Sequence, residues 1–429
     1  MNKKMNYLFT TWEDGGNVSP ALVVVQKLLA RGHRVRVMSE ECNRPESEAA
    51  GATFISWKRA PNRRDRKPES QTCRDWAAAT PQEGLLSVIR DTWAGPALLH
   101  AQDVLDELRR EPCDLVVTCE ALFGVMAACE SRGQKFATLC PNISLKPLPG
   151  VPPLGPGFAP ARNEQERALH AKIAQASVGL FDSGLPALNV ARVALGLKPL
   201  AHLLDQFQSA TVELLATSRA FDFPADSLPN RMRYVGPQIG DPHWARPWAS
   251  PWPKSDVRPL VTVGFSTTFQ NHAEVLQKVI DALAPLLVRV LVTLGGSIRP
   301  GELRAGDNCV LVESAPHSVV MREAAFIVTH GGHGTVMRGL LSRVPMLVIP
   351  HGRDQNDNAA RITERGAGLS LMLDASVEDI RAACSRLLKD DSFLAAAKKL
   401  GALVATEAEN SMVAEELEAA AAEAHRVAA

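Results

Sequence analysis

The segment FIVTHGGHGTVMRGLLSRVPMLVIPHGRDQNDNAARITERGAG, residues 326–368, alternates apolar runs with glycine-rich turns and helical patterns. The apolar run ending at Thr329 predicts a buried strand, and residues 334–343 predict a helix after a tight turn. Residues 345–350 predict the next strand, and residues 358–367 the helix that follows it. A helix between two strands is the parallel crossover unit of an α/β sheet, so the segment predicts that fold class.

A turn rich in glycine, from His330 to Thr335, joins the first strand to the first helix. Glycine lets the backbone bend sharply and lets a ligand approach closely. The N–H groups and partial positive charge at a helix start form an anion site, to which His330 can donate a further hydrogen bond. Ligands bind at the carboxyl ends of such strands. The strand ending at Pro350 therefore brings more polar groups to the same edge, namely His351, Asp354, Gln355 and Asn358.

The polar groups at this edge suggest a sugar phosphate as the ligand. A phosphate site beside Asp354 and Gln355, whose side chains can bind hydroxyl groups, fits that ligand. The turn matches neither G-x-G-x-x-G nor G-x-x-x-x-G-K-[ST], which disfavours nicotinamide cofactors and the P-loop. The alternative interpretation is a tight turn with a purely structural role.

The α/β pattern occurs on both sides of residues 236–256, a proline-rich segment with three tryptophans. Such a segment is typical of a linker between domains. We therefore expect one α/β domain at residues 1–235 and a second at residues 257–405, followed by a helical tail at residues 406–429.

Local signals in the first half predict where its elements begin and end. Residues 7–12 predict a strand, and the helix after it is expected to start at Ser19 as N-cap, with Pro20 in the first turn. Residues 141–160 are dense in proline and glycine and predict a long loop. Residues 163–195 predict a helical stretch.

Composition excludes several classes of protein. Lys plus Arg and Asp plus Glu both number 47, and this balance disfavours a nucleic-acid binder. The eight cysteines are scattered, without a C-x-x-C pair or zinc-ligand spacing, as in a reduced cytoplasmic protein. No apolar run reaches about 18 residues, and the N-terminus makes a poor signal peptide. We therefore expect a cytoplasmic protein without membrane insertion.

The segment 326–368 resembles the donor-binding signature of glycosyltransferase family one. The family pattern is H-x-G-x-G-[ST]-x-x-E, then P-x-x-x-[DE]-Q-x-x-N-A, where this chain has HGGHGTVMR and PHGRDQNDNA. GGNVSPALVVVQKLLARGHRVRV, CDLVVTC and SAPHSVVMREAAFIVTH are similar to further family elements. The resemblance implies the GT-B fold, with two Rossmann-like doubly wound domains facing a central cleft. The N-terminal domain would bind the acceptor and the C-terminal domain the nucleotide sugar.

The resemblance also implies roles for single residues. His330 would contact the donor diphosphate, and Asp354 and Gln355 would hold hydroxyls of the sugar. Ala315 would meet the base through its backbone, with His317 where the family often has Gln. The other positions of the expected donor site are Ser266, Thr267, Gly332, His333, Gly334, Thr335, Arg338 and Asn358.

These remaining positions differ in what is expected of them. Ser266 and Thr267 would approach the phosphates, and Gly334 and Thr335 would bind phosphate oxygens. Asn358 lies either near the phosphate or in a structural position. His333 is expected to be structural or to face a lid rather than to act in catalysis.

Three positions depart from the family pattern. Arg338 replaces a Glu that binds the ribose hydroxyls; an Arg only donates, so it either pairs with phosphate or faces solvent. Asn17 replaces the His that deprotonates the acceptor, and an amide cannot do so at neutral pH. Cys119 replaces the Asp that orients that His.

The general base is therefore open. Glu13 and Asp14 lie in the same loop as Asn17, and Glu120 follows Cys119; a buried carboxylate among these is one possibility. An acidic phenol as acceptor, which needs little help, is the other.

The expected function is inverting transfer of a hexose from a nucleotide-diphosphate sugar, such as UDP-glucose or a dTDP-sugar, without metal or other cofactor. The acceptor would be a hydroxyl of a phenolic or other small hydrophobic natural product, with the loop at 141–160 as one wall of its site. We expect a monomer or homodimer. The alternative is a non-catalytic auxiliary partner of another glycosyltransferase, because the His/Asp pair is replaced by Asn17 and Cys119. A sugar-nucleotide epimerase of the same fold is disfavoured, since no acid/base pair can be assigned.

Overall fold

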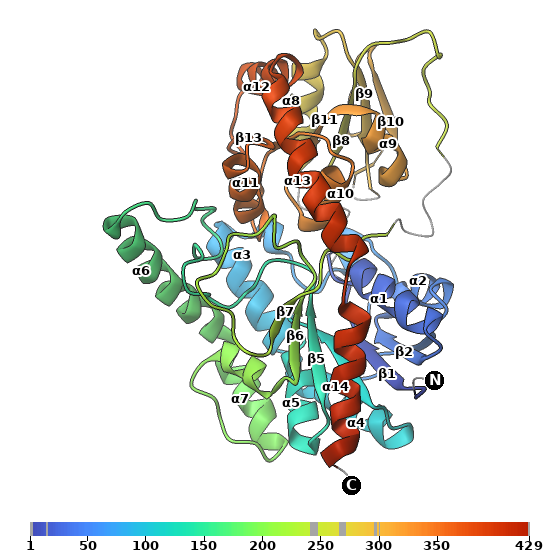
Figure 1. The fold of residues 1–429 in the computed structure, drawn as a ribbon, viewed down its shortest axis with the longest axis vertical. Coiled ribbons are helices and arrows are strands. Elements are labelled where there is room, and N and C mark those ends of the chain that lie inside the picture. Colours follow the sequence, from blue (N-terminus) through green and yellow to red (C-terminus); the bar gives the residue numbers. More distant parts are fainter. Residues whose placement is uncertain are drawn as a thin grey trace.

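The computed structural model describes residues 3–13, 16–240, 248–265, 272–295, 298–299 and 301–427. Its described strands form two parallel sheets, one in each half of the chain (Figure 1). The first sheet has the order β3-β2-β1-β4-β5-β6-β7 and the second the order β10-β9-β8-β11-β12-β13. In each sheet the order reverses beside the first strand, and ligands of open α/β sheets bind at the carboxyl ends of the strands at such a point.

The strands of the first sheet are β1 (Asn6–Thr10), β2 (Arg34–Ser39), β3 (Thr53–Ser56), β4 (Leu115–Cys119), β5 (Phe136–Cys140), β6 (Val212–Leu215) and β7 (Met232–Tyr234). Those of the second are β8 (Leu260–Gly264), β9 (Arg289–Thr293), β10 (Cys309–Val312), β11 (Ala324–Thr329), β12 (Met346–Val348) and β13 (Gly368–Ser370). Every residue of β4, β5 and β8 is buried, as expected of central parallel strands covered by helices on both faces.

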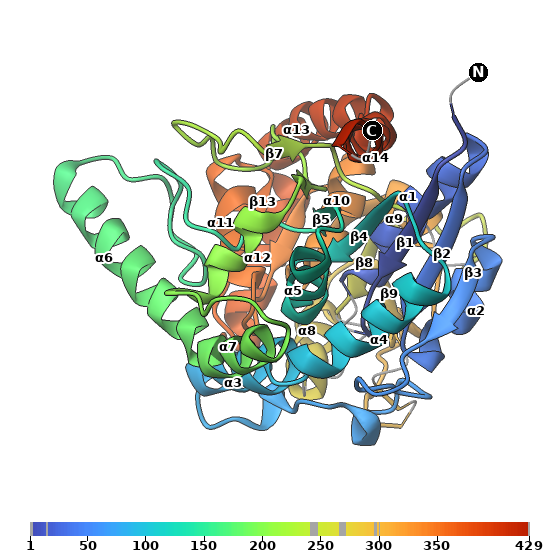
Figure 2. The same ribbon diagram turned by 90° about the horizontal axis from the view of Figure 1, so that it is seen from below.

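The helices of the first half are α1 (Val18–Ala30), α2 (Arg44–Ala49), α3 (Pro81–Ser87), α4 (Ala97–Arg110), α5 (Phe123–Arg132), α6 (Glu164–Phe181) and α7 (Leu185–Ala194). Those of the second half are α8 (Ala273–Leu283), α9 (His317–Glu323), α10 (His333–Leu341), α11 (Gln355–Glu364), α12 (Val377–Lys389), α13 (Asp391–Glu409) and α14 (Val413–Val427). The helix α6 projects from the side of the first half (Figure 2), and Phe181 is its single buried residue.

One predicted helix boundary is wrong. The helix α1 begins at Val18, with Asn17 at the N-cap position, so Ser19 and Pro20 both lie in its first turn. Val18 is buried, and Pro20 is tolerated there because the first N–H groups of a helix have no partner within it. The helical stretch predicted at 163–195 is confirmed, as two helices separated by a 3-10 turn at Asp182–Gly184.

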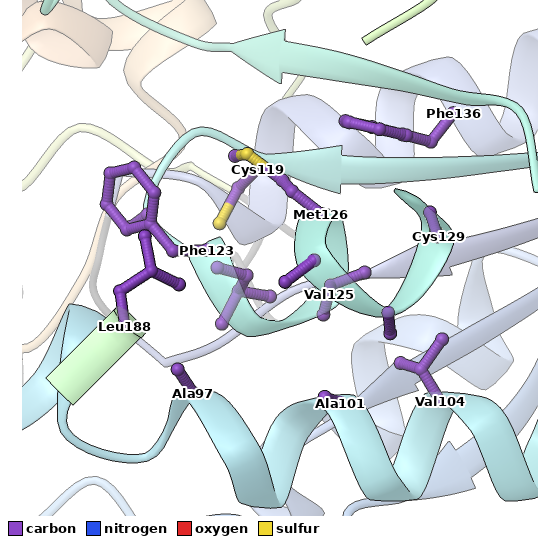
Figure 3. Close-up of a cluster of buried hydrophobic side chains, with 14 of the residues drawn as sticks. Ala97, Ala101, Val104, Cys119, Phe123, Val125, Met126, Cys129, Phe136 and Leu188 are labelled. Carbon is purple, nitrogen blue, oxygen red and sulfur yellow. The ribbon is translucent and has the colours of Figure 1, made fainter. Parts of the chain in front are cut away.

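A close helix crossing supports the first sheet. Ala97, Ala101 and Val104 of α4 pack against α5 (Figure 3). A Cβ atom at Gly124 of α5 would lie 2.0 Å from the carbonyl oxygen of Ala97, so only glycine allows this approach.

The last two helices connect the halves. The helix α13 packs on α10 in the second half, and α14 continues onto the sheet of the first half (Figure 1). Arg31 of α1 forms ion pairs with Glu415 at 2.8 Å and Glu418 at 2.7 Å. The Nε2 atom of His33 lies 2.7 Å from Glu418 Oε1. The C-terminal helix is therefore part of the N-terminal half.

Candidate active site

The carboxyl ends of β8, β11 and β12, which are adjacent strands, carry Phe265, His330 and His351. The ring of Phe265 lies 6.0 Å from that of His330 and 5.3 Å from that of His351, centre to centre. His272, just before α8, lies 5.7 Å from the same Phe265 ring. Three histidines thus surround one aromatic ring at the edge where the sequence predicts the donor.

These histidines are neutral near pH 7. Burial lowers the pKa of His272 and of His351 to about 4, and it lowers the pKa of His330 well below the ordinary value. A neutral imidazole can donate one hydrogen bond and accept another. An anion placed beside the rings would favour their protonated form, so binding of a phosphate group and protonation would support each other.

The glycine turn after β11 is shaped around His330. Gly331 has a φ of +92°, a conformation that other residues seldom adopt. A Cβ atom at Gly332 would lie 2.5 Å from His330 Nε2, so glycine at this position leaves room for the ring. The helix α10 then begins at His333, with Gly334 and Thr335 in its first turn. The turn therefore places a histidine beside the N-terminus of a helix, as the anion-site prediction requires.

Asn358 joins the two turns at this edge. Its Nδ2 atom donates to the carbonyl of Gly331 at 2.9 Å and to Asp354 Oδ2 at 2.6 Å. Gln355 Oε1 accepts the N–H of His351 at 2.7 Å. Burial raises the pKa of Asp354, against the hydrogen bonds from the side chains of Asn358 and Asn142. The groups predicted for the sugar site are thus brought together, and they are bonded to the turns that carry them.

The side chains of His333 and Arg338 both form hydrogen bonds within the protein. His333 Nε2 lies 2.7 Å from the Oγ1 atom of Thr217, in the first half. Arg338 Nη2 donates to the carbonyl of Gly240 at 2.8 Å, and Nη1 to the carbonyl of Gly334 at 3.2 Å. Arg338 therefore contacts the backbone where the linker begins.

The remaining predicted donor positions follow β8 and β10 in the chain. Ala315 is buried after β10 in a cluster with Leu260 and Val320, and His317 begins α9. Ser266 and Thr267 lie outside the described residues, as does Asp14.

The acids at the edge of the first sheet are largely engaged. Glu13 is buried and pairs with Arg66 at 3.1 Å, and Asn17 Oδ1 accepts the N–H of Trp12 at 3.4 Å. Glu120 lies close to Cys119 and Cys140, and burial, followed by this carboxylate, raises the pKa of both thiols. These positions carry no carboxylate–imidazole pair of the kind that the family pattern has.

Sequence reasoning missed Glu40, which follows β2 directly. It is almost fully buried, and its carboxylate accepts the N–H groups of Glu13 and Arg63. Burial raises its pKa to about 7. An acid directly after a predicted strand was the available signal in the sequence, but the burial of Glu40 depends on the loop that covers it.

The described part of the chain holds no group of three or more His, Cys, Asp or Glu residues placed to bind a metal ion. Among the helices of that same part, none has the length and apolar character needed to cross a bilayer.

Comparison with known proteins identifies the class. Residues 277–420 match the family model of the C-terminal domain of erythromycin biosynthesis protein CIII-like proteins. The 4'-demethylrebeccamycin synthase of Lentzea aerocolonigenes is 28% identical, over 92% of this chain and 94% of its own. The demethyllactenocin mycarosyltransferase of Streptomyces fradiae is 25% identical, over 88% and 78%.

Solved structures agree on the fold. The glycosyltransferase of kitacinnamycin has a TM-score of 0.76 at 17% identity and covers 98% of this chain and 100% of its own. The calicheamicin glycosyltransferase CalG4 has a TM-score of 0.69 at 19% identity, over 97% and 98%. The two parallel α/β sheets therefore form the GT-B fold. The matching family model and the relatives named above show that the chain is a glycosyltransferase, similar to natural-product enzymes of antibiotic pathways.

Proposed function

We propose that this glycosyltransferase moves a hexose from a nucleotide-diphosphate sugar to a hydroxyl group of a small hydrophobic acceptor, with inversion and without a metal ion. The observation that carries the donor assignment is the turn at 330–335. It sets His330 beside the N-terminus of α10, and Gly332 leaves the space that the ring needs.

Related structures support the choice of donor. The glycosyltransferase VinC, which is 20% identical and has a TM-score of 0.65, was solved in complex with dTDP. SsfS6 of Streptomyces sp. SF2575 was solved with thymidine diphosphate. We therefore place dTDP-sugars beside UDP-sugars in the donor range.

The choice of acceptor depends on the general base, because Asn17 stands where the family pattern has a histidine. Asn17 cannot take up a proton from a hydroxyl at neutral pH. Glu13 is engaged in an ion pair with Arg66 at 3.1 Å, and a carboxylate is by its ordinary pKa a weak base. A weak base suffices for an acidic hydroxyl, so a phenolic acceptor fits this site better than an aliphatic alcohol does.

The test is a panel of UDP- and dTDP-hexoses with phenolic and macrolide acceptors, analysed by mass spectrometry. We expect a hexosylated phenol, formed equally in the presence of EDTA, with the opposite anomeric configuration to the donor by NMR. His330→Ala serves as the inactive control. Absence of transfer, together with absence of nucleotide binding by calorimetry, would remove the proposal.

The base is tested by Glu13→Gln and Glu120→Gln, each compared with wild type over a range of pH. Glu364→Gln, an exposed acid on α11, is the matched control. If both carboxamide variants turn over at the wild-type rate at every pH, neither acid is the base, and Asp14 or an unassisted phenol remains.

A further inference from the structure

One face of α11 contacts the first half of the molecule. Asp357, Arg361 and Arg365 recur every four residues and so lie on the same side of the helix. Arg361 Nη2 lies 2.7 Å from Asp222 Oδ1, and both side chains are only 3% exposed. Arg365 donates to the carbonyl of Ala220 at 2.9 Å. These contacts hold α11 to the segment between β6 and β7.

Asp357 contacts a different segment, the proline- and glycine-rich loop at 141–160. Its Oδ2 atom accepts the N–H of Gly155 at 2.7 Å, and its Oδ1 atom accepts the N–H of Gly157 at 3.1 Å. Asn356 adds a bond from its Nδ2 atom to the carbonyl of Gly155 at 3.1 Å. Asp357 is 2% exposed, so this carboxylate has exchanged water for two backbone N–H groups of the loop.

The loop can approach α11 this closely because it has glycine at the points of contact. Gly155 has a φ of +114° and Gly157 a φ of +74°. A Cβ atom at Gly157 would lie 2.6 Å from the carbonyl oxygen of Asn356. The two glycines of this loop, Gly155 and Gly157, therefore both serve the contact between the loop and α11.

The same helix begins at the candidate donor site. Asp354 is its N-cap residue, and it is hydrogen-bonded to Asn358 and to Asn142, which lies at the start of the loop. Asn358 in turn bonds the glycine turn at Gly331. A movement of the loop away from Asp357 would thus pull on the helix that carries Asp354 and Gln355.

We propose that Asp357 is a positioning residue. It holds the 141–160 loop against α11, and this contact sets the position of the acceptor-site wall relative to the donor sugar. The docking follows from the contacts alone; its effect on the acceptor rests on the proposed function. The carboxylate touches neither reactant and acts through the loop.

The first test measures the loop directly, in the protein without ligands. Hydrogen exchange at the amides of Gly155 and Gly157 is compared between wild type, Asp357→Ala and Asp357→Asn. We expect exchange to become roughly 10- to 100-fold faster in Asp357→Ala, because a charge-assisted bond is lost from each amide, and to change less in Asp357→Asn. Glu364→Gln, which weakens an exposed contact of the same helix to Arg162, should leave both amides unchanged.

The second test separates the acceptor from the donor. Asp357→Ala should raise the acceptor KM by about tenfold, while the Kd of dTDP or UDP, measured by calorimetry, stays within about twofold. Asn356→Ala keeps Asp357 and should show a weaker effect of the same kind, which keeps the test usable if Asp357→Ala does not fold. Unchanged exchange at Gly155 and Gly157, or equal losses for acceptor and nucleotide, would overturn the proposal. If no transfer occurs with any donor, the proposed function fails, while the exchange measurement still decides the docking.

Discussion

The Nε2 atom of His333 lies 2.7 Å from the Oγ1 atom of Thr217, across the boundary between the two halves. Both side chains are buried, and burial lowers the pKa of His333 to about 3. The ring is therefore neutral at physiological pH, and the hydrogen bond persists. The glycine turn that we assign to the donor is thus tied at its far end to the segment that follows β6.

Thr217→Val tests this tie. Valine keeps the shape of threonine but leaves a buried nitrogen of His333 without its partner, so we expect the free energy of unfolding to fall by about 1–3 kcal/mol. Denaturant titration measures the change. Thr406→Val, on the exposed surface of α13, is the control and should change stability far less. Equal losses in the two variants would show that the bond to His333 contributes nothing.

Gly332→Ala tests how the turn makes room for His330. The φ of Gly332 is −59°, so alanine fits the backbone there and the expected effect comes from the methyl group alone. Because that methyl group would overlap the imidazole, we expect the affinity for dTDP or UDP to fall by roughly tenfold, which is about 1.4 kcal/mol. Gly179→Ala on α6, where a methyl group meets nothing within 4 Å, should bind nucleotide like wild type. Wild-type nucleotide affinity in Gly332→Ala would mean that His330 does not contribute to donor binding.

Arg338→Ala tests whether this residue serves the linker or the nucleotide. Its guanidinium donates to the carbonyls of Gly240 and Gly334, so its loss should lower stability by about 1–2 kcal/mol. The Kd of the nucleotide should stay within about twofold. Arg322→Ala, at an exposed position of α9, controls for loss of one positive charge. A large rise in the Kd of Arg338→Ala alone would instead assign the guanidinium to a phosphate group.

Glu40→Gln tests the buried acid after β2. Burial raises the pKa of Glu40 from its usual 4.5 to about 7, so the folded protein holds a proton that the unfolded chain releases. The resulting stabilisation is complete below pH 4.5 and is lost as the pH rises through 7. The shift corresponds to about 3 kcal/mol.

Denaturation at pH 5 and pH 8 checks this sign. Wild type should lose stability between the two pH values, and Glu40→Gln should lose less, because glutamine does not titrate. Glu48→Gln, which removes an exposed acid nearby, should follow wild type. Parallel pH profiles for wild type and Glu40→Gln would mean that Glu40 is ionised throughout.

The sequence was informative where the signal is local. The turn at His330 and the strand–helix alternation around it predicted the second sheet, because apolar runs and glycine spacing are properties of neighbouring residues. The short outer strands β3 and β13 were missed, since four and three residues carry too little pattern. Asn17 was not predicted as the N-cap of α1 because burial of Val18 moved the start of the helix.

Contacts between distant segments could not be predicted. The ion pair between Asp222 and Arg361 joins residues 139 positions apart. The sequence around either residue gives no indication of its partner. The burial of Glu40 and the gathering of His272 with His351 likewise depend on which strands lie side by side. The roles of Asp354, Gln355 and Arg338 toward a ligand stay predictions, which the variants above address.

The return of α14 to the first sheet also bears on how the chain folds during synthesis. Val413, Leu417 and Ala421 belong to the same buried cluster as Tyr7, Phe9 and Val25. Until residue 421 has left the ribosome, this face of the N-terminal sheet lacks the part of its cover that α14 supplies, although the sheet itself is made earlier. The nascent N-terminal half must therefore keep these apolar residues from aggregating until α14 is made, and removal of α14 would expose the same residues in the folded enzyme.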